Sequence, residues 1–256
     1  MWQTVTQKDT FCEVTLMDVN KRVIVALDVD NIDEVRSIVQ KVGKNVSTFK
    51  VGMRLFTKYG PSLVKELKEK GYGIFLDLKY HDIPNTVETA CREAGELGVD
   101  MLTIHACGGR EMCRCAVKGA EEGAKKAGNK TPVVLAVTVL TSMNQEALKE
   151  VGVTNSVEAQ VLALAEMATS EGVGGIVCSA LEVKKLKQNI KHKFVAVVPG
   201  IRFADGDTND QKRIASPDVA VSEGADYLVM GRPIYGAKDP VEALNKTYAL
   251  IQGVKN

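Results

Sequence analysis

The sequence predicts an α/β protein, a single (β/α)8 TIM barrel with its active site at the C-terminal ends of the strands. Short apolar segments alternate with amphipathic segments along the chain, as strands and helices alternate around a parallel sheet. The apolar segments are apolar on both faces, which is typical of strands that helices cover on both sides. The 256 residues fit the usual barrel length of roughly 250, and no Pro/Gly/Ser-rich linker divides them.

The first half of the chain supplies four strand-helix units. We expect one domain over 1–256, in which an extension over 1–20 precedes a barrel over about 21–256. The first helix is predicted from apolar side chains that recur on one face of 32–42. The strands expected in this half are 23–28, 47–52, a segment that begins at Tyr72, and 100–105. The corresponding helices are 32–42, 61–70, 85–97 and 109–126.

The second half repeats the pattern four times. Its expected strands are 133–138, 175–178, 194–198 and 227–230, and its expected helices are 156–171, 181–188, 217–223 and 240–251. A doubly wound open sheet is the alternative fold. Such sheets usually carry a glycine-rich turn after the first strand, whereas 27–30 reads Leu-Asp-Val-Asp and contains no glycine. The barrel is therefore favoured.

Composition excludes several classes of function. Lysine and arginine number 33 against 32 acidic residues, and no basic stripe with interleaved aromatics exists, so nucleic acid is not an expected partner. No apolar run reaches the length of a signal peptide or a membrane span, and we expect a cytoplasmic protein without a membrane partner. The six cysteines are expected to be free thiols, and their spacing does not suit a metal site.

Charged residues stand where the first three predicted strands end. Asp28 ends the first, Lys50 lies in the second, and Asp77 and Lys79 share one face of the third because side chains alternate along a strand. Strand ends of a barrel converge on one mouth, so these four charges should meet there. A buried ion-pair network is the structural alternative for any one pair. Four charges on consecutive strand ends favour a catalytic site.

The turn that follows Lys79 contains a further carboxylate, Asp82. Helix capping is its structural alternative. Asn85 with Glu88 makes a better capping box, however, and this would leave Asp82 available for another role.

A second group of candidates lies near the end of the chain. The loop over 200–216 is bounded by Pro199 and Pro217, and a loop of this length in a compact barrel is typical of a lid or binding loop. Barrels commonly hold phosphate at their seventh and eighth loops. Arg202 and Arg232 are therefore predicted to bind a phosphate group, with solvated surface arginines as the alternative.

Several motifs together resemble those of one family. The segment 75–86, Phe-Leu-Asp-Leu-Lys-Tyr-His-Asp-Ile-Pro-Asn-Thr, resembles the signature of orotidine 5′-phosphate decarboxylase. The resemblance continues at 26–28, 49–52, 198–202, 210–213 and 229–234, in chain order. The departures are Ala204, where proline is frequent, and Ser216, where threonine is common.

The resemblance implies a reaction and a set of roles. The reaction is decarboxylation of orotidine 5′-monophosphate to uridine 5′-monophosphate, the last step of de novo pyrimidine nucleotide synthesis, without a cofactor or metal. Lys79 would protonate C6 of the pyrimidine, and Asp77 would lie against the departing carboxylate. The implied catalytic residues are Lys50, Asp77, Lys79 and Asp82.

The resemblance also implies a nucleotide site shared within a homodimer. Asp82, Ile83 and Thr86 would reach into the site of the partner subunit. The implied substrate-binding residues are Asp28 and Lys50 for the ribose, Ser142 for the pyrimidine, Gln211 between base and phosphate, Arg202, Gly231 and Arg232 for the phosphate, and Ile83, Thr86 and Pro199.

Two other functions stay open on the residues alone. One is a magnesium-dependent relative that shares the Asp-x-Lys-x-x-Asp pattern of 77–82 and acts on an open-chain sugar phosphate; it would need a further acidic ligand near the mouth, where Lys50 stands. The other is a non-catalytic barrel that binds a nucleotide and regulates a partner, against which the presence of Lys79 argues.

Overall fold

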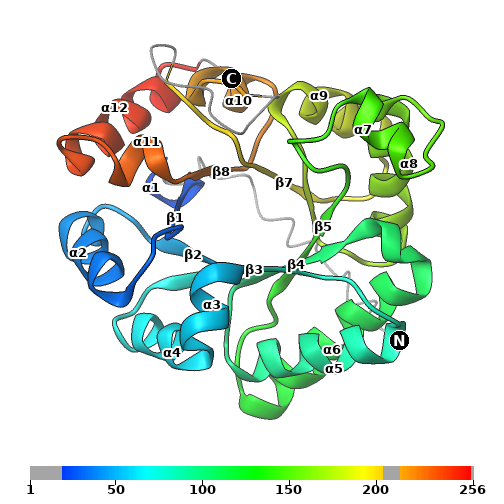
Figure 1. Cartoon of the computed structure of the whole chain (residues 1–256), viewed down its shortest axis with the longest axis horizontal. Helices are drawn as coiled ribbons and strands as arrows, with labels where there is room; N and C mark the ends of the chain where they lie inside the picture. The colour runs from blue at the N-terminus through cyan, green and yellow to red at the C-terminus, as the bar shows by residue number, and fades with distance from the viewer. Residues whose placement is uncertain (1–18, 204–213, 255–256) are drawn as a thin grey trace, which may run out of the picture.

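The computed structural model describes residues 19–203 and 214–254, which form a closed barrel of parallel strands ringed by helices (Figure 1). Each strand pairs with the next along the chain, and β8 pairs with β1 to close the sheet. The predicted (β/α)8 barrel is confirmed. The strands are β1 (Val23–Ala26), β2 (Thr48–Gly52), β3 (Gly73–Tyr80), β4 (Met101–His105), β5 (Val133–Val137), β6 (Gly175–Val177), β7 (Val195–Val198) and β8 (Tyr227–Met230).

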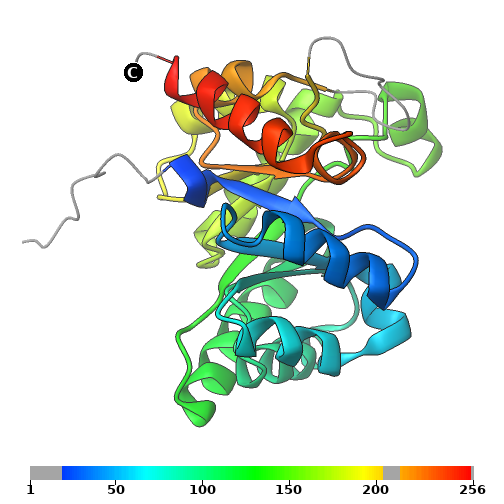
Figure 2. The ribbon, with the colours of Figure 1, turned by 90° about the vertical axis from the view of Figure 1, so that its left-hand side faces the viewer.

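Every predicted helix is present within one or two residues of its expected bounds. These helices are α2 (Ile32–Val42), α4 (Pro61–Glu69), α5 (Pro84–Glu96), α6 (Gly109–Ala127), α8 (Val157–Ser170), α9 (Ala180–Asn189), α10 (Pro217–Ser222) and α12 (Pro240–Gln252). In Figure 2, α1 (Val19–Arg22) leads into β1, and α1 lies against α12.

The structure also contains short helices that the apolar pattern did not predict. They are α1, α3 (Met53–Tyr59), the 3-10 turn η1 (Ala106–Gly108), α7 (Gln145–Glu150) and α11 (Arg232–Tyr235). None of them buries more than one residue. A single buried side chain gives no helical period, so the sequence pattern could not indicate them.

Two apolar layers hold the barrel together. Val23 and Val25 of β1 face outward and pack against the helices, whereas Ile24 and Ala26 face inward. The inner layer is small, and Phe75 of β3 is its largest side chain. Ala26, Phe75 and Val229 of this layer also line the cavity described below, beside the polar groups at the C-terminal ends of the strands.

Helix α5 starts one residue earlier than predicted, and the expected capping box does not form. Pro84 occupies the first helical position, where its fixed φ suits the helix, and the cap residue Ile83 has no side-chain acceptor. Glu88 instead pairs with Arg92 and Lys118. The prediction that Asn85 and Glu88 cap α5 was therefore wrong.

Close packing on α6 fixes the position of α5. At Gly119 of α6 an added Cβ would lie 2.1 Å from the carbonyl oxygen of Glu88, and at Gly123 it would lie 1.9 Å from that of Arg92. Only glycine allows the two helices to approach this closely. This close packing therefore holds α5, which directly follows the turn, against α6.

Among the helices of residues 19–203 and 214–254, none is long and apolar enough to cross a membrane.

Candidate active site

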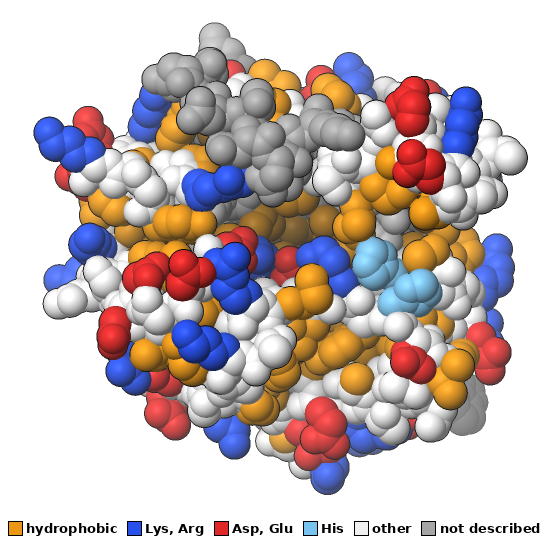
Figure 3. Space-filling view, viewed as in Figure 1, with side chains coloured by type: hydrophobic (Ala, Val, Ile, Leu, Met, Phe, Trp, Pro, Cys, Tyr) orange, Lys and Arg blue, Asp and Glu red, His pale blue; other side chains and the backbone are white. Residues whose placement is uncertain are grey.

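A cavity of about 560 Å³ opens at the C-terminal ends of the strands. Figure 3 shows it as a hollow in the barrel face with acidic and basic side chains along it. The predicted residues that line it are Asp28, Lys50, Asp77, Lys79, Ser142, Pro199, Arg202, Gly231 and Arg232. The structure thus brings together residues from both halves of the chain, as the barrel topology predicts.

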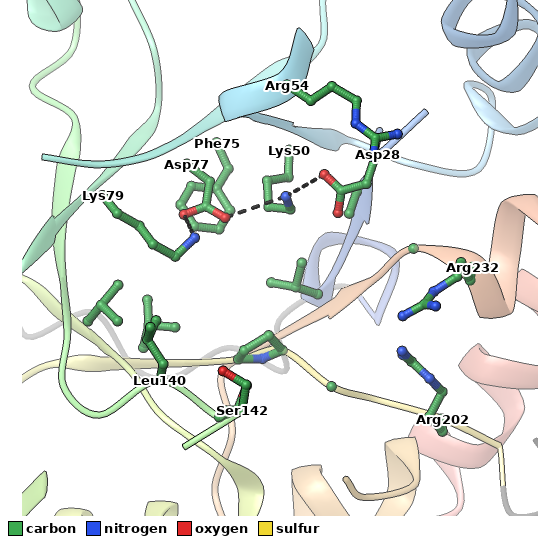
Figure 4. A pocket seen from close by; sticks show the side chains of 18 of the residues that line it. Asp28, Lys50, Arg54, Phe75, Asp77, Lys79, Leu140, Ser142, Arg202 and Arg232 are labelled. Carbon is green, nitrogen blue, oxygen red and sulfur yellow. Dashed lines mark hydrogen bonds and ion pairs between the residues drawn. The ribbon is translucent and has the colours of Figure 1, made fainter. Parts of the chain in front are cut away.

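Four charges form a continuous row along one side of the cavity (Figure 4). Lys50 Nζ lies 2.9 Å from Asp28 Oδ1 and 3.4 Å from Asp77 Oδ2. Lys79 Nζ lies 2.8 Å from Asp77 Oδ1. The side chains of Lys50 and Asp77 are 9% and 13% exposed, whereas that of Asp28 is 53% exposed. Each inner charge therefore touches an opposite charge, and the alternating row offsets the cost of burying them.

The pKa shifts of the inner pair keep both groups charged. Burial raises the pKa of Asp77, but the charges of Lys50 and Lys79 outweigh it, and the pKa lies below its ordinary value of 3.8. Burial lowers the pKa of Lys50, but the charges of Asp77 and Asp28 outweigh it, and that pKa lies above 10.5. A carboxylate and an ammonium group thus stand fixed beside the cavity at neutral pH.

The end of β3 departs from regular strand geometry. Leu76 pairs with Leu102, but the next pairing joins Tyr80 to Ile104, so β3 holds two more residues than β4 over this interval. Within this irregular interval Lys79 has a φ of 52°. This left-handed conformation costs a non-glycine residue about 1–3 kcal/mol. Despite this bulge, the side chains of both Asp77 and Lys79 line the cavity, as the strand pattern predicted.

Two arginines, Arg202 and Arg232, lie on the other side of the cavity from Asp77 and Lys79, and their guanidinium groups point toward each other (Figure 4). Arg202 follows β7 and is 8% exposed, whereas Arg232 begins α11 and is exposed. A bridge between Ile201 and Ala215 joins the two ends of the predicted loop, and the Arg202 N–H donates to the Ala215 carbonyl at 2.9 Å. Two guanidinium groups that approach each other form a natural site for a dianion such as phosphate.

Of the remaining predicted residues, those that the structure describes do not line this cavity. Asp82, Ile83 and Thr86 are exposed on the turn before α5 and its first helical turn, and Ile83 is 67% exposed. Asp82 Oδ1 accepts a hydrogen bond from the N–H of its neighbour Ile83 at 2.7 Å. Gln211 and Ala204 lie outside the described residues, as does most of the extension over 1–20.

Apolar and neutral residues of the cavity escaped the sequence analysis. They are Ala26, Phe75, Val137, Val139, Leu140, Thr141, Val177, Gly200, Val229 and Tyr235, together with the exposed Arg54. Phe75 could have been found, because it is two residues before Asp77 and therefore shares its face of β3. Tyr235 could not, because its position depends on a hydrogen bond to the Asp28 carbonyl, 207 residues away in the chain.

This arrangement suits a small anionic substrate with a reacting carbon near Lys79. The arginine pair can hold a phosphate, and Asp28 and Lys50 offer an acceptor and a donor for hydroxyl groups. Apolar side chains such as Phe75 and Val177 exclude water beside the Asp77–Lys79 pair, which strengthens its electrostatic effect on a bound molecule.

Comparison with known proteins identifies the family. A family model described as Orotidine 5′-phosphate decarboxylase / HUMPS family matches residues 21–247. The orotidine 5′-phosphate decarboxylase of Moorella thermoacetica is 43% identical over 244 residues, which cover 95% of this chain and 97% of that protein. The decarboxylase of Heliobacterium modesticaldum is 47% identical over 231 residues, which cover 90% and 95%.

A solved structure of the same family also resembles this chain in fold. The crystal structure of orotidine 5′-phosphate decarboxylase from Lactobacillus acidophilus has a TM-score of 0.81 and 41% identity, and the match covers 91% of this chain and 100% of that one. The resemblance read from the segment 75–86 and its companion motifs is thereby confirmed. This chain belongs to the Orotidine 5′-phosphate decarboxylase / HUMPS family.

Proposed function

We propose that this chain decarboxylates orotidine 5′-monophosphate to uridine 5′-monophosphate and carbon dioxide, without a cofactor and in the cytoplasm. The observation that carries the proposal is the placement of the Asp28–Lys50–Asp77–Lys79 row opposite Arg202 and Arg232 in one cavity. A nucleoside monophosphate has a phosphate at one end and a base at the other, and this cavity offers a matching group to each. The product completes de novo pyrimidine nucleotide synthesis.

The chemistry follows from the charges. Arg202 and Arg232 bind the phosphate, Asp28 and Lys50 bind the ribose hydroxyls, and the pyrimidine C6 lies next to Lys79. When the bond from C6 to the carboxylate breaks, carbon dioxide leaves and the electron pair stays on C6. The Lys79 ammonium group stabilises this pair and then gives it a proton, and water later restores the proton on Lys79.

Asp77 holds the proton donor in place. Its Oδ1 contacts Lys79 Nζ at 2.8 Å, and its Oδ2 faces Lys50. The ammonium group is therefore oriented before substrate arrives, which avoids the cost of reorganising it during the reaction. Binding of the remote phosphate supplies the free energy that brings the substrate carboxylate close to this negative charge.

The direct test is turnover of orotidine 5′-monophosphate in the presence of a chelator. We expect its ultraviolet absorbance to be lost at the same rate with and without the chelator. No loss of absorbance would refute the proposal. The alternative is the magnesium-dependent relative considered from the sequence, and stimulation by magnesium with a keto-sugar phosphate, together with no turnover of orotidylate, would favour it.

We further propose that the active site is completed by a second copy of the chain. Asp82, Ile83 and Thr86 are exposed and do not line the cavity of their own barrel, yet they follow directly on the strand that carries Asp77 and Lys79. Packing on α6 holds α5, and the turn before it, in a fixed position. In an isologous dimer each turn can reach the cavity of the other subunit, so that Asp82 extends the row of charges beyond Lys79.

Mixing two inactive variants tests the shared site. Lys79→Ala lacks the proton donor and Asp82→Ala lacks the residue supplied to the partner. After subunit exchange, about half of the dimers are mixed and each holds one complete site, so about a quarter of the wild-type activity should return. Lack of recovery, with exchange verified by mass spectrometry, would contradict the shared site. A mixture of Lys79→Ala with Asp77→Ala serves as the control, because both changes fall in the same barrel and no complete site can form.

A further inference from the structure

A buried threonine joins the two charged residues of β3. Thr103 of β4 is 0% exposed, and its hydroxyl makes two hydrogen bonds at once. It donates to Asp77 Oδ1 at 2.9 Å and accepts from the Lys79 backbone N–H at 2.9 Å. The same Asp77 oxygen contacts Lys79 Nζ. One hydroxyl is thus tied to the carboxylate, to the backbone of the lysine and, through Asp77, to its ammonium group.

The two hydrogen bonds of Thr103 lie where the regular backbone pairing between β3 and β4 is interrupted. Between Leu76 and Tyr80 the ladder from β3 to β4 is interrupted, and Lys79 has the left-handed φ of 52°. The Thr103 hydroxyl takes the place of a carbonyl that would otherwise accept the Lys79 N–H. Without it that N–H would lose this acceptor, and the left-handed conformation would lose a bond that stabilises it.

We infer that Thr103 is a positioning residue for the decarboxylation, which sets the orientation of the Asp77 carboxylate and the backbone of Lys79. The inference rests on the proposed function. Thr103 does not line the cavity and is not expected to touch the substrate. It acts through Asp77 and Lys79, and its removal should lower the rate of the chemical step without weakening nucleotide binding.

A different buried threonine provides a matched control. Thr247 of α12 is also 0% exposed, and its hydroxyl donates to the Ala243 carbonyl at 2.9 Å within its own helix. It does not line the cavity. Replacement of either residue by valine keeps the shape of the side chain and removes one buried hydroxyl. The two variants therefore carry a similar structural change, and only one of them touches the Asp77–Lys79 pair.

The test compares Thr103→Val, Thr103→Ser and Thr247→Val with the wild type. For Thr103→Val we expect kcat to fall about 10- to 100-fold, as misplacement of reacting groups does elsewhere, while KM and affinity for uridine 5′-monophosphate stay near wild type. Thr103→Ser keeps the hydroxyl and should recover most of kcat. Thr247→Val should retain the wild-type kcat. If Thr103→Val does not fold, Thr103→Cys replaces it, because a thiol of similar size is a much weaker hydrogen-bonding group.

The outcomes separate this inference from the proposed function. A wild-type chain that does not consume orotidylate would refute the function itself. A wild-type chain that turns over, with Thr103→Val equally fast, would overturn the inference alone. A loss of thermal stability in Thr103→Val with unchanged kcat would assign Thr103 a structural role and also overturn it.

Discussion

The end of strand β3 and the turn that follows it carry similar residues but have different surroundings. Asp77 and Lys79 are largely buried, and Asp77 has contacts to Lys50, Lys79 and Thr103. Asp82, three residues after Lys79, is exposed, and its carboxylate bonds to the N–H of the next residue. The charged groups of the strand end thus have partners within their own barrel, whereas the turn presents a carboxylate that does not line the cavity of its own barrel.

Residues 77–83 thus contain two parts with different surroundings, the strand end and the turn that follows it. The bulge at Lys79 interrupts the regular pairing of β3 shortly before the strand ends at Tyr80, and Pro84 then starts α5. Residues before the bulge are fixed by neighbouring strands of the same barrel. Residues 82 and 83, after the bulge, are exposed on the turn before α5, which is where the proposed dimer would bring a second subunit. Catalytic effects and stability effects should therefore separate along this segment.

The largest expected effect is the loss of activity in Lys79→Ala. Removal of a group that donates a proton in the transition state commonly costs 10²- to 10⁴-fold, and we expect a fall of about 10³-fold or more in kcat. Affinity for uridine 5′-monophosphate, measured by calorimetry, should persist because the arginines are unchanged. Lys149→Ala, at an exposed lysine of α7, is the control and should keep full activity. If Lys79→Ala bound nucleotide and the parent chain had no activity to lose, a non-catalytic nucleotide-binding barrel would be favoured.

A comparison of Asp77→Ala with Asp82→Ala should separate the two regions by stability. Asp77→Ala leaves Lys79 without its carboxylate and Lys50 with only the exposed Asp28, and we expect a loss of about 3 kcal/mol in the free energy of unfolding. Asp82→Ala removes an exposed carboxylate and should cost less than about 1 kcal/mol. Both variants should nonetheless lose activity. Urea unfolding at equal m-values measures the difference in stability. Equal destabilisation by the two changes would contradict the contrast between a buried strand end and an exposed turn.

The smallest expected effect concerns pH. The pKa of Asp77 is lower in the folded chain than its ordinary value of 3.8, so its contribution to stability is present above pH 3.8 and is lost as pH falls through the folded value. The difference in unfolding free energy between the wild type and Asp77→Asn should therefore be the same at about pH 7 and about pH 5, and smaller at about pH 3. Urea titrations at the three pH values measure it. A difference that already declines between pH 7 and pH 5 would show that the lysines do not hold this pKa down.

Much of the site could be predicted because its charges fall at strand ends. Asp28, Lys50, Asp77 and Lys79 were placed by strand order and alternation alone, and Arg202 and Arg232 by their positions after the seventh and eighth strands. A closed barrel brings such positions to one mouth whatever the details of packing. The predicted loop over 200–216 is joined at its base by Ile201 and Ala215.

Other features had no local signal. Thr103 is a β-branched residue in a strand and fits an ordinary buried strand position, so its hydroxyl bonds to Asp77 and Lys79 could not be foreseen. The capping box at Asn85 and Glu88 was a wrong prediction, because Pro84 starts the helix and Glu88 pairs with basic residues of α5 and α6.

The sequence by itself determined the order of strands and helices, the family, and the set of charges that meet at the mouth of the barrel. The element order and the charges follow from apolar periodicity and from residue types at strand ends, which depend on near neighbours in the chain. The family follows from the resemblance of the segment 75–86 and its companion motifs. Only the tertiary structure decided the bulge at Lys79, the bond partners of Thr103, and the hydrogen bond from Tyr235 to the Asp28 carbonyl. Those depend on register and on contacts between distant segments, because a hydrogen bond is set by the positions of both of its atoms.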